Sequence, residues 1–226
     1  MSLRPTHEHE FEAQRGLPAP LPAGERILWQ GSPQARVLAR RVFHIDLVAI
    51  YFAVLLAWRV GEVLADGGSA VEALSGATWI AFGAALGLGL LALLASFTAR
   101  TTVYTLTDRR VVMRIGIVLT AAYNLPLVRI ESAALHDAGQ GCGDIALKLP
   151  RGTRIAFLHL WPHVRPWQLR QPQPMLRGLP DAAAVAALLG TAWAAANGLQ
   201  PQTAQTPADS AATAQTPPMR HVLAGH

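Results

Sequence analysis

The chain has 226 residues, of which 51% are hydrophobic and only 15% are charged, and its formal net charge is +5. This charge comes from 18 arginines and one lysine that are spread along the chain, a pattern that does not favour a nucleic-acid-binding protein. The single cysteine, Cys142, excludes an internal disulfide bond and agrees with a cytoplasmic location for the segment that carries it.

Residues 1–41 are expected to form a polar leader and a pre-membrane segment. Residues 1–22 are polar and rich in proline, and they lack the apolar core of a cleavable signal peptide. Between the breakers Gly24 and Pro33, residues 27–29 favour either a short strand or a segment at the membrane interface. In the second case Trp29 would lie at the level of the lipid headgroups.

Two apolar runs predict a membrane-spanning helical hairpin within residues 42–98. Residues 73–99 contain no charged side chain, and their central part forms a helix about 30 Å long, which matches the hydrocarbon core of a bilayer. The shorter run, residues 42–58, carries His44 and Asp46 near its start, and its alternative is a re-entrant or surface-lying helix. We predict transmembrane helices at about 42–60 and 77–98.

Arginines flank the two runs and predict the topology. The connecting loop instead carries three acidic residues besides Arg59. By the positive-inside rule, both termini are cytoplasmic and the protein is a multi-pass protein of the bacterial inner membrane. The flanking arginines expected to contact anionic lipid headgroups are Arg40, Arg41, Arg100, Arg109, Arg110 and Arg114.

Residues 99–197 are predicted to form a cytoplasmic domain. Residues 101–107 and 110–115 are rich in β-branched residues and indicate two strands joined by a turn at Asp108-Arg109. Short runs at similar spacing continue the pattern, and together they predict a small antiparallel barrel or sandwich. These further runs are residues 117–119, 127–132, 145–149 and 153–160.

The rest of the chain divides into three parts. Residues 161–180 contain five prolines and are expected to be irregular. Residues 181–197 carry an apolar stripe at helical spacing and predict a helix that closes one end of the sheet structure. Residues 198–226 are of low complexity and are expected to form a disordered tail.

The sequence offers no catalytic group, metal site or cofactor site in a recognisable context, so we predict that the protein is not an enzyme. Cys142 lies between two glycines, which favours a hairpin turn over a reactive thiol. His159 and His163 are four residues apart, but Pro162 opposes the helix that would align them as ligands. His44 is the one candidate ligand for the magnesium of a chlorin pigment in the membrane.

The segment from Trp161 to Trp167 is the best candidate for a binding surface. Tryptophan and arginine dominate binding hot spots, and proline lowers the entropy cost of docking. The alternative is that the two indole rings pack back on the domain's own apolar face. The residues predicted to bind a partner are Trp161, His163, Arg165, Trp167, Met175 and Arg177.

Several motifs resemble the membrane-attached form of the bacterial pleckstrin-homology-like (PH-like) domain. They are GERILWQGSP (24–33) before the paired helices and YTLTDRRVVMRIG (104–116) after them. With LPLVRIES (125–132), LHLWPHVRPW (158–167) and PQPMLR (172–177), the chain resembles the photosynthetic complex assembly proteins that purple bacteria encode beside the reaction-centre H subunit. The resemblance covers residues from about 11 to 196.

The resemblance implies a fold of seven strands in two orthogonal sheets, forming a barrel capped by a C-terminal helix. It also implies a non-enzymatic factor that promotes assembly of the reaction centre, and thereby of the core light-harvesting complex, and that forms homodimers. Its partners would be reaction-centre subunits and membrane lipids. Three alternatives remain open: a lipid-binding or envelope-stress module, a protein that delivers pigment, and a membrane hydrolase, for which the sequence lacks a credible nucleophile.

Overall fold

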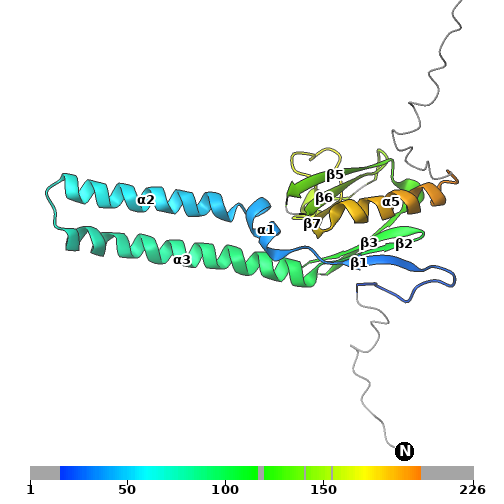
Figure 1. Ribbon diagram of the computed structural model, residues 1–226, viewed down its shortest axis with the longest axis horizontal. Helices are drawn as coiled ribbons and strands as arrows, with labels where there is room; N and C mark the ends of the chain where they lie inside the picture. Colours follow the sequence, from blue (N-terminus) through cyan, green and yellow to red (C-terminus); the bar gives the residue numbers. More distant parts are fainter. Residues whose placement is uncertain (1–15, 117–119, 140, 154, 200–226) are drawn as a thin grey trace, which may run out of the picture.

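The computed structural model describes residues 16–116, 120–139, 141–153 and 155–199. Two long helices project from one end of a unit built from two small β-sheets and a third helix (Figure 1). The predicted strand at 117–119 lies outside the described residues, as do most of the predicted leader and tail.

The two long helices are α2 (Ile45–Ala65) and α3 (Ala70–Thr101), and they pack side by side as a hairpin (Figure 1). Both are long and apolar enough to cross a membrane. None of the most apolar window of α2 and only 11% of that of α3 is buried, so protein does not cover these apolar surfaces. This exposure distinguishes the hairpin from the core helices of a soluble domain.

Helix α3 begins seven residues before the predicted start because its N-terminus is capped. Ser69 accepts a hydrogen bond from the backbone N–H of Glu72, and the Glu72 carboxylate accepts one from the backbone N–H of Ser69. This capping box satisfies two N–H groups that a helix start leaves free. The helix therefore extends to the tip of the hairpin.

A short helix that the sequence did not predict, α1 (Ala35–Arg41), lies at the base of the hairpin. Its Leu38 is fully buried in a cluster with Phe43 and with Ala95 and Ala99 of α3. The small alanines of α3 let α1 approach closely, and the cluster joins α1 to α3. The last turns of α3 are thus covered by protein.

Two antiparallel sheets form the rest of the unit. The first contains β1 (Ile27–Gly31), β2 (Val103–Thr107), β3 (Arg110–Ile115) and β4 (Ala121–Pro126) in that order. The second contains β5 (Ser132–Gly139), β6 (Cys142–Lys148) and β7 (Met175–Pro180). The seven strands in two antiparallel sheets agree with the fold that the resemblance implies, but among the described residues no strand pairing joins the two sheets into a closed barrel.

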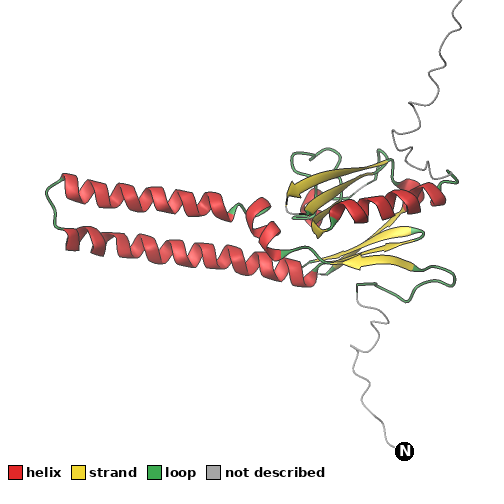
Figure 2. Cartoon of the chain, viewed as in Figure 1, coloured by secondary structure: helices red, strands yellow, loops and turns green. Residues whose placement is uncertain are grey.

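The predicted C-terminal helix is confirmed as α5 (Ala182–Ala196). Figure 2 shows it lying against the sheets, and its buried face shares one apolar core with both of them. Trp193 of α5 donates a hydrogen bond from Nε1 to the carbonyl oxygen of Ile130 at 2.8 Å, which fixes the helix on the segment between β4 and β5.

Three predictions of local structure differ from the observed elements, and the alternative left open at residues 27–29 is decided in favour of a strand. Residues 27–29 belong to β1, which pairs with β2, so the segment before the hairpin is part of the sheet and Trp29 packs against its core. Residues 127–129 form a 3-10 turn, and Phe157–Leu160 form a short helix, α4, instead of a strand. Residues 161–180 are not wholly irregular, because β7 begins at Met175.

Candidate functional site

Residues 157–171, between β6 and β7, form a segment that we call the tryptophan loop. It carries four large apolar side chains that no part of the described protein covers well: Leu158, Trp161, Trp167 and Leu169. Trp167 is 92% exposed and Leu158 is 84% exposed. Large apolar side chains gathered on one loop of a domain indicate a contact surface for another molecule.

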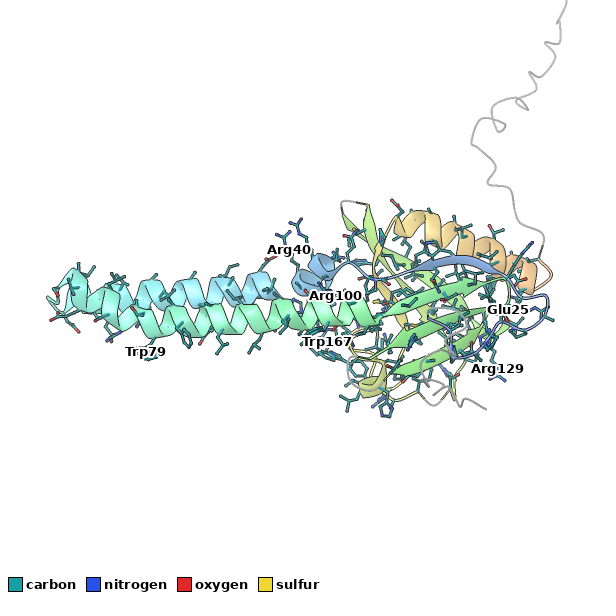
Figure 3. All side chains as sticks on the ribbon, turned by 90° about the horizontal axis from the view of Figure 1, so that it is seen from below. Glu25, Arg40, Trp79, Arg100, Arg129 and Trp167 are labelled. Carbon is teal, nitrogen blue, oxygen red and sulfur yellow. The ribbon has the colours of Figure 1, made fainter. Side chains whose placement is uncertain are left out.

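The tryptophan loop lies at the base of the hairpin. The ring of Trp161 packs edge-to-face on Phe43, with ring centroids 5.8 Å apart, and Phe43 belongs to the cluster that joins α1 to α3. Figure 3 shows Trp167 and Arg100 at the end of the hairpin that adjoins the sheets. The backbone of Trp167 has a φ of 65°, a left-handed conformation that bulky residues rarely adopt. The indole is thus held outward at some cost to the fold.

Only part of the predicted binding residues lies on this surface. Arg165 is exposed with the two tryptophans and donates a hydrogen bond from Nη1 to Gln173 at 3.1 Å. His163 is only 1% exposed and Met175 is buried, so neither is accessible to a partner. This corrects the prediction for both residues: the chain turns inward at His163, between the two tryptophans, and Met175 is the first residue of the largely buried strand β7.

His163 is the centre of a buried polar network that fixes the tryptophan loop. Its Nδ1 lies 2.6 Å from the hydroxyl oxygen of Tyr104 on β2, and its Nε2 lies 3.1 Å from the hydroxyl oxygen of Thr102 at the end of α3. The Tyr104 oxygen also accepts a hydrogen bond from the backbone N–H of Arg177 at 3.2 Å. Because a buried hydroxyl needs an acceptor, we assign the Tyr104 proton to the bond with Nδ1, which leaves the His163 proton on Nε2 to be donated to Thr102.

Burial decides the protonation of this network. Removal from water lowers the pKa of His163 to about 3, with a smaller effect from the positive charge of Arg177, and it raises the pKa of Tyr104 above its usual range. Both side chains are accordingly neutral at neutral pH. Sequence reasoning missed Tyr104 and Thr102, because each lies about 60 residues from His163 and no motif links them.

Arg177 also faces the interior rather than a partner. Its Nη2 donates to the carbonyl oxygen of Val164 at 3.0 Å, so the side chain ties β7 to the tryptophan loop. Burial lowers its pKa, while the negative charge of Asp144 raises it. The Arg177 guanidinium thus holds the tryptophan loop in place from the interior of the domain, and the predicted role of this residue in partner binding is corrected accordingly.

The arginines predicted to contact lipid fall into two groups. Arg40, Arg41 and Arg100 lie at the base of the hairpin, and Arg114 pairs in register with Val103, just after α3 ends (Figure 3). Arg109 and Arg110 instead lie at the far end of the β2–β3 hairpin, because β2 runs about 13 Å away from α3.

Arg110 is engaged within the protein as well. Its Nε and Nη2 donate to the two carboxylate oxygens of Glu25 at 2.7 and 2.9 Å, and the Glu25 side chain is almost fully buried. Figure 3 shows Glu25 at the end of the molecule opposite the hairpin. Arg109 and Arg110 therefore do not lie beside the helices, and this structure does not support their predicted contact with lipid headgroups.

Cys142 is buried at the start of β6, where its thiol lies 3.3 Å from the Oε1 of Gln34. A serine hydroxyl has a similar size and donates the same hydrogen bond. We expect Cys142→Ser to change the thermal midpoint of the detergent-solubilised protein by less than about 2 °C and to leave partner capture intact. A loss of capture with an unchanged midpoint would instead reveal a reactive thiol.

His44 is the N-terminal cap residue of α2 and is exposed at the base of the hairpin. Among the described residues, no three His, Cys, Asp or Glu side chains are grouped as ligands of a metal ion would be.

Comparison with known proteins identifies the family of the chain. The sequence pattern described as "Bacterial PH domain" matches residues 37–193, more than half of the chain. The chain belongs to the bacterial PH domain family. No solved structure matches the chain.

A similar protein from Rhodobacter capsulatus is described as an "Uncharacterized 23.7 kDa protein in puhA 5'region". The two sequences are 40% identical over 209 residues, which cover 92% of this chain and 97% of the relative. The similarity therefore includes the helical hairpin as well as the sheets.

Proposed function

We propose that this bacterial PH domain protein is a non-enzymatic membrane assembly factor for the photosynthetic reaction centre. The hairpin anchors the protein, and the tryptophan loop binds subunits of the complex as they enter the membrane. The observation that carries the proposal is the position of exposed Trp161 and Trp167 at the base of an exposed apolar hairpin.

The distribution of aromatic residues supports the membrane location. Trp58 and Trp79 are exposed near the tip of the hairpin, and Trp161 and Trp167 lie at its base (Figure 3). Between Trp79 and Phe97, α3 rises about 27 Å, close to the thickness of a bilayer's hydrocarbon core. Tryptophans are favoured at both interfaces of a membrane. With the arginines of the base on the cytoplasmic side, both termini lie in the cytoplasm.

The genetic setting of the relative supports the photosynthetic role. The Rhodobacter capsulatus protein is described by its place beside puhA, a reaction-centre gene of a purple bacterium. Neighbouring bacterial genes often serve one process, and the relative matches this chain over nearly its whole length. The motifs in residues 104–116 and 158–167, which resemble those of photosynthetic complex assembly proteins, support the same role.

The geometry supplies a mechanism for assembly. Membrane anchoring confines the protein to the surface where reaction-centre subunits are inserted, so the tryptophan loop meets them at a high effective concentration. The loop is fixed from within by His163 and Arg177, which reduces the entropy lost when it binds. Exposed tryptophans then contribute most of the binding free energy.

The test is an affinity purification from detergent-solubilised membranes of phototrophically grown cells. The tagged wild-type protein is expected to retain reaction-centre subunits, and Trp161→Ala with Trp167→Ala is expected to reduce their recovery at least tenfold, because two hot-spot indoles are lost. Val128→Ala, which shortens an exposed apolar side chain elsewhere on the domain, is the control and should leave recovery unchanged. Equal recovery from all three proteins would contradict the proposal.

Two further roles are open to the same fold. A lipid-binding or envelope-stress module would be recovered with lipid alone in this purification. A pigment-delivery protein would carry bacteriochlorophyll through His44, which an absorption spectrum of the purified protein detects. Self-association, which the resemblance implies, predicts a dimer by cross-linking in membranes.

A further inference from the structure

A groove of about 510 Å³ lies between α1 and the turn that joins β5 to β6. Three arginines of one short helix, Arg36, Arg40 and Arg41, line it together with a single acidic side chain, Asp46. The opposite wall is formed by small side chains and backbone at Ala138, Gly139 and Cys142, while Val37 adds an apolar patch. Grooves of this size accommodate small organic ligands.

The charges of the groove are unbalanced. Arg40 pairs with Asp46 through an Nε to Oδ2 contact of 3.4 Å, and both groups are largely exposed. Arg36 and Arg41 have no acidic counterpart among the described residues that line the groove. The groove thus carries the positive charges of Arg36, Arg40 and Arg41 against the one negative charge of Asp46, and these positive charges repel one another. A bound anion would relieve that repulsion.

The helix that carries these arginines is held rigidly. Leu38 is fully buried against α3 and lies on the side of α1 opposite Arg36 and Arg40, which therefore face the groove, while Arg41 lines the groove from the last position of the helix. Figure 1 shows α1 at the base of the hairpin, with the end of β5 pointing toward it. The groove therefore opens beside the first turn of α2, where Asp46 lies.

We propose that this groove binds the phosphodiester headgroup of one anionic phospholipid. The acyl chains would run along α2, whose exposed surface directly beyond the groove is apolar at Leu47, Ile50 and Tyr51. Arginine guanidinium groups bind phosphate oxygens through charge-assisted hydrogen bonds. The site rests on the proposed membrane location and is independent of the reaction-centre role.

A lipid explains the position of the groove better than a free phosphate ion does. A soluble anion needs the arginines only, whereas a lipid also needs a neighbouring apolar surface that reaches from the headgroup level into the membrane. The groove and α2 supply both. Diffuse attraction to an anionic membrane would in turn depend on the number of arginines rather than on their place in the fold.

The experiment measures binding of phosphatidylglycerol to the purified full chain in detergent by native mass spectrometry. The wild type is expected to bind one phosphatidylglycerol molecule in preference to phosphatidylcholine. Arg36→Gln with Arg41→Gln should weaken this binding at least tenfold, since each arginine near a membrane surface contributes several-fold. Asp46→Asn should tighten it two- to fivefold, because the only acidic group of the groove is removed.

The matched control is Arg109→Gln with Arg129→Gln, which removes the same charge from exposed positions outside the groove. Figure 3 places Arg129 at the end of the molecule opposite the hairpin. Binding within twofold of the wild type is expected. Equal weakening in the two double variants would overturn the proposal in favour of diffuse attraction, and unchanged binding in the groove variant would overturn it outright.

A competition with inorganic phosphate distinguishes a phospholipid headgroup from a free phosphate ion as the anion that the groove binds. Millimolar phosphate should not displace phosphatidylglycerol, and full displacement would overturn the lipid assignment. The measurement uses no reaction-centre subunit. Failure here with subunits still recovered through the tryptophan loop would reject the groove alone, whereas lost recovery with intact lipid binding would reject the proposed assembly role.

Discussion

Replacing Tyr104 by phenylalanine is expected to lower the free energy of unfolding by about 3 kcal/mol. The hydroxyl of Tyr104 is the partner of His163 Nδ1 and of the backbone N–H of Arg177, and the tyrosine is fully buried. Its removal leaves two buried polar groups without a partner, and each costs roughly 1–3 kcal/mol. Chemical denaturation of the protein in detergent micelles, followed by circular dichroism, measures the change.

Tyr123→Phe is the matched control for this variant. Tyr123 lies on β4 of the same sheet, is only partly buried and packs its ring against the same core. We expect a change below about 1 kcal/mol there. Equal effects of the two substitutions would show that the network around His163 contributes no more than an ordinary surface contact.

Acidification is expected to destabilise the domain through His163. Its pKa is about 3 in the folded protein and near 6.5 in the unfolded chain, so the unfolded state binds the proton first. The stability is fully present above pH 6.5 and is lost progressively as the pH falls toward 3. Between pH 7.5 and pH 5 this loss amounts to about 2 kcal/mol.

Measurements of the unfolding free energy at several pH values test this prediction. His163→Gln removes the titrating group. The variant should be less stable than the wild type at pH 7.5, but its unfolding free energy should fall less steeply between pH 7 and pH 5. His159→Gln, at an exposed position of the same loop, should keep the slope of the wild type. An unchanged slope in His163→Gln would assign the acid sensitivity to other groups.

Both predictions bear on partner binding, because the network holds the tryptophan loop in place. Thr102, Tyr104 and Arg177 connect the loop to the end of α3, to β2 and to β7. A loosened network frees the loop without altering Trp161 or Trp167. Recovery of reaction-centre subunits is therefore expected to fall in Tyr104→Phe as well, although less than in the double tryptophan variant.

The parts of the fold that could be predicted are those whose residues carry a local signal. The hairpin follows from long uncharged runs, the β2–β3 turn from Asp108-Arg109, and α5 from its apolar stripe. Strand β4 has the sequence AAYNLP and β7 lies among prolines, so neither shows the β-branched pattern of a strand. Their pairing with β3 and β6 makes them strands, and pairing is not a local property.

The same distinction between local and non-local information applies to the candidate site. Residue type indicates that Trp161 and Trp167 are suited to binding, and the structure leaves them exposed. Sequence cannot tell that His163, between them, turns inward, because its partners come from distant segments. Likewise, Arg110 looks equivalent to Arg40 in sequence, but the direction of β2 carries it away from the helices to Glu25.

The pairing of β1 with β2 sets an order for biosynthesis. The two strands are neighbours in one sheet, yet the whole hairpin is synthesised between them, and Ile27 pairs with Thr107. At translation rates of roughly 5–20 residues per second, β1 waits about 4–15 s for its partner. In the proposed membrane topology, β1 meets that partner only if the second helix brings the chain back to the same side of the membrane. Completion of the sheet thus reports correct insertion, and a chain with a misinserted helix keeps an open strand edge by which the cell can recognise and degrade it.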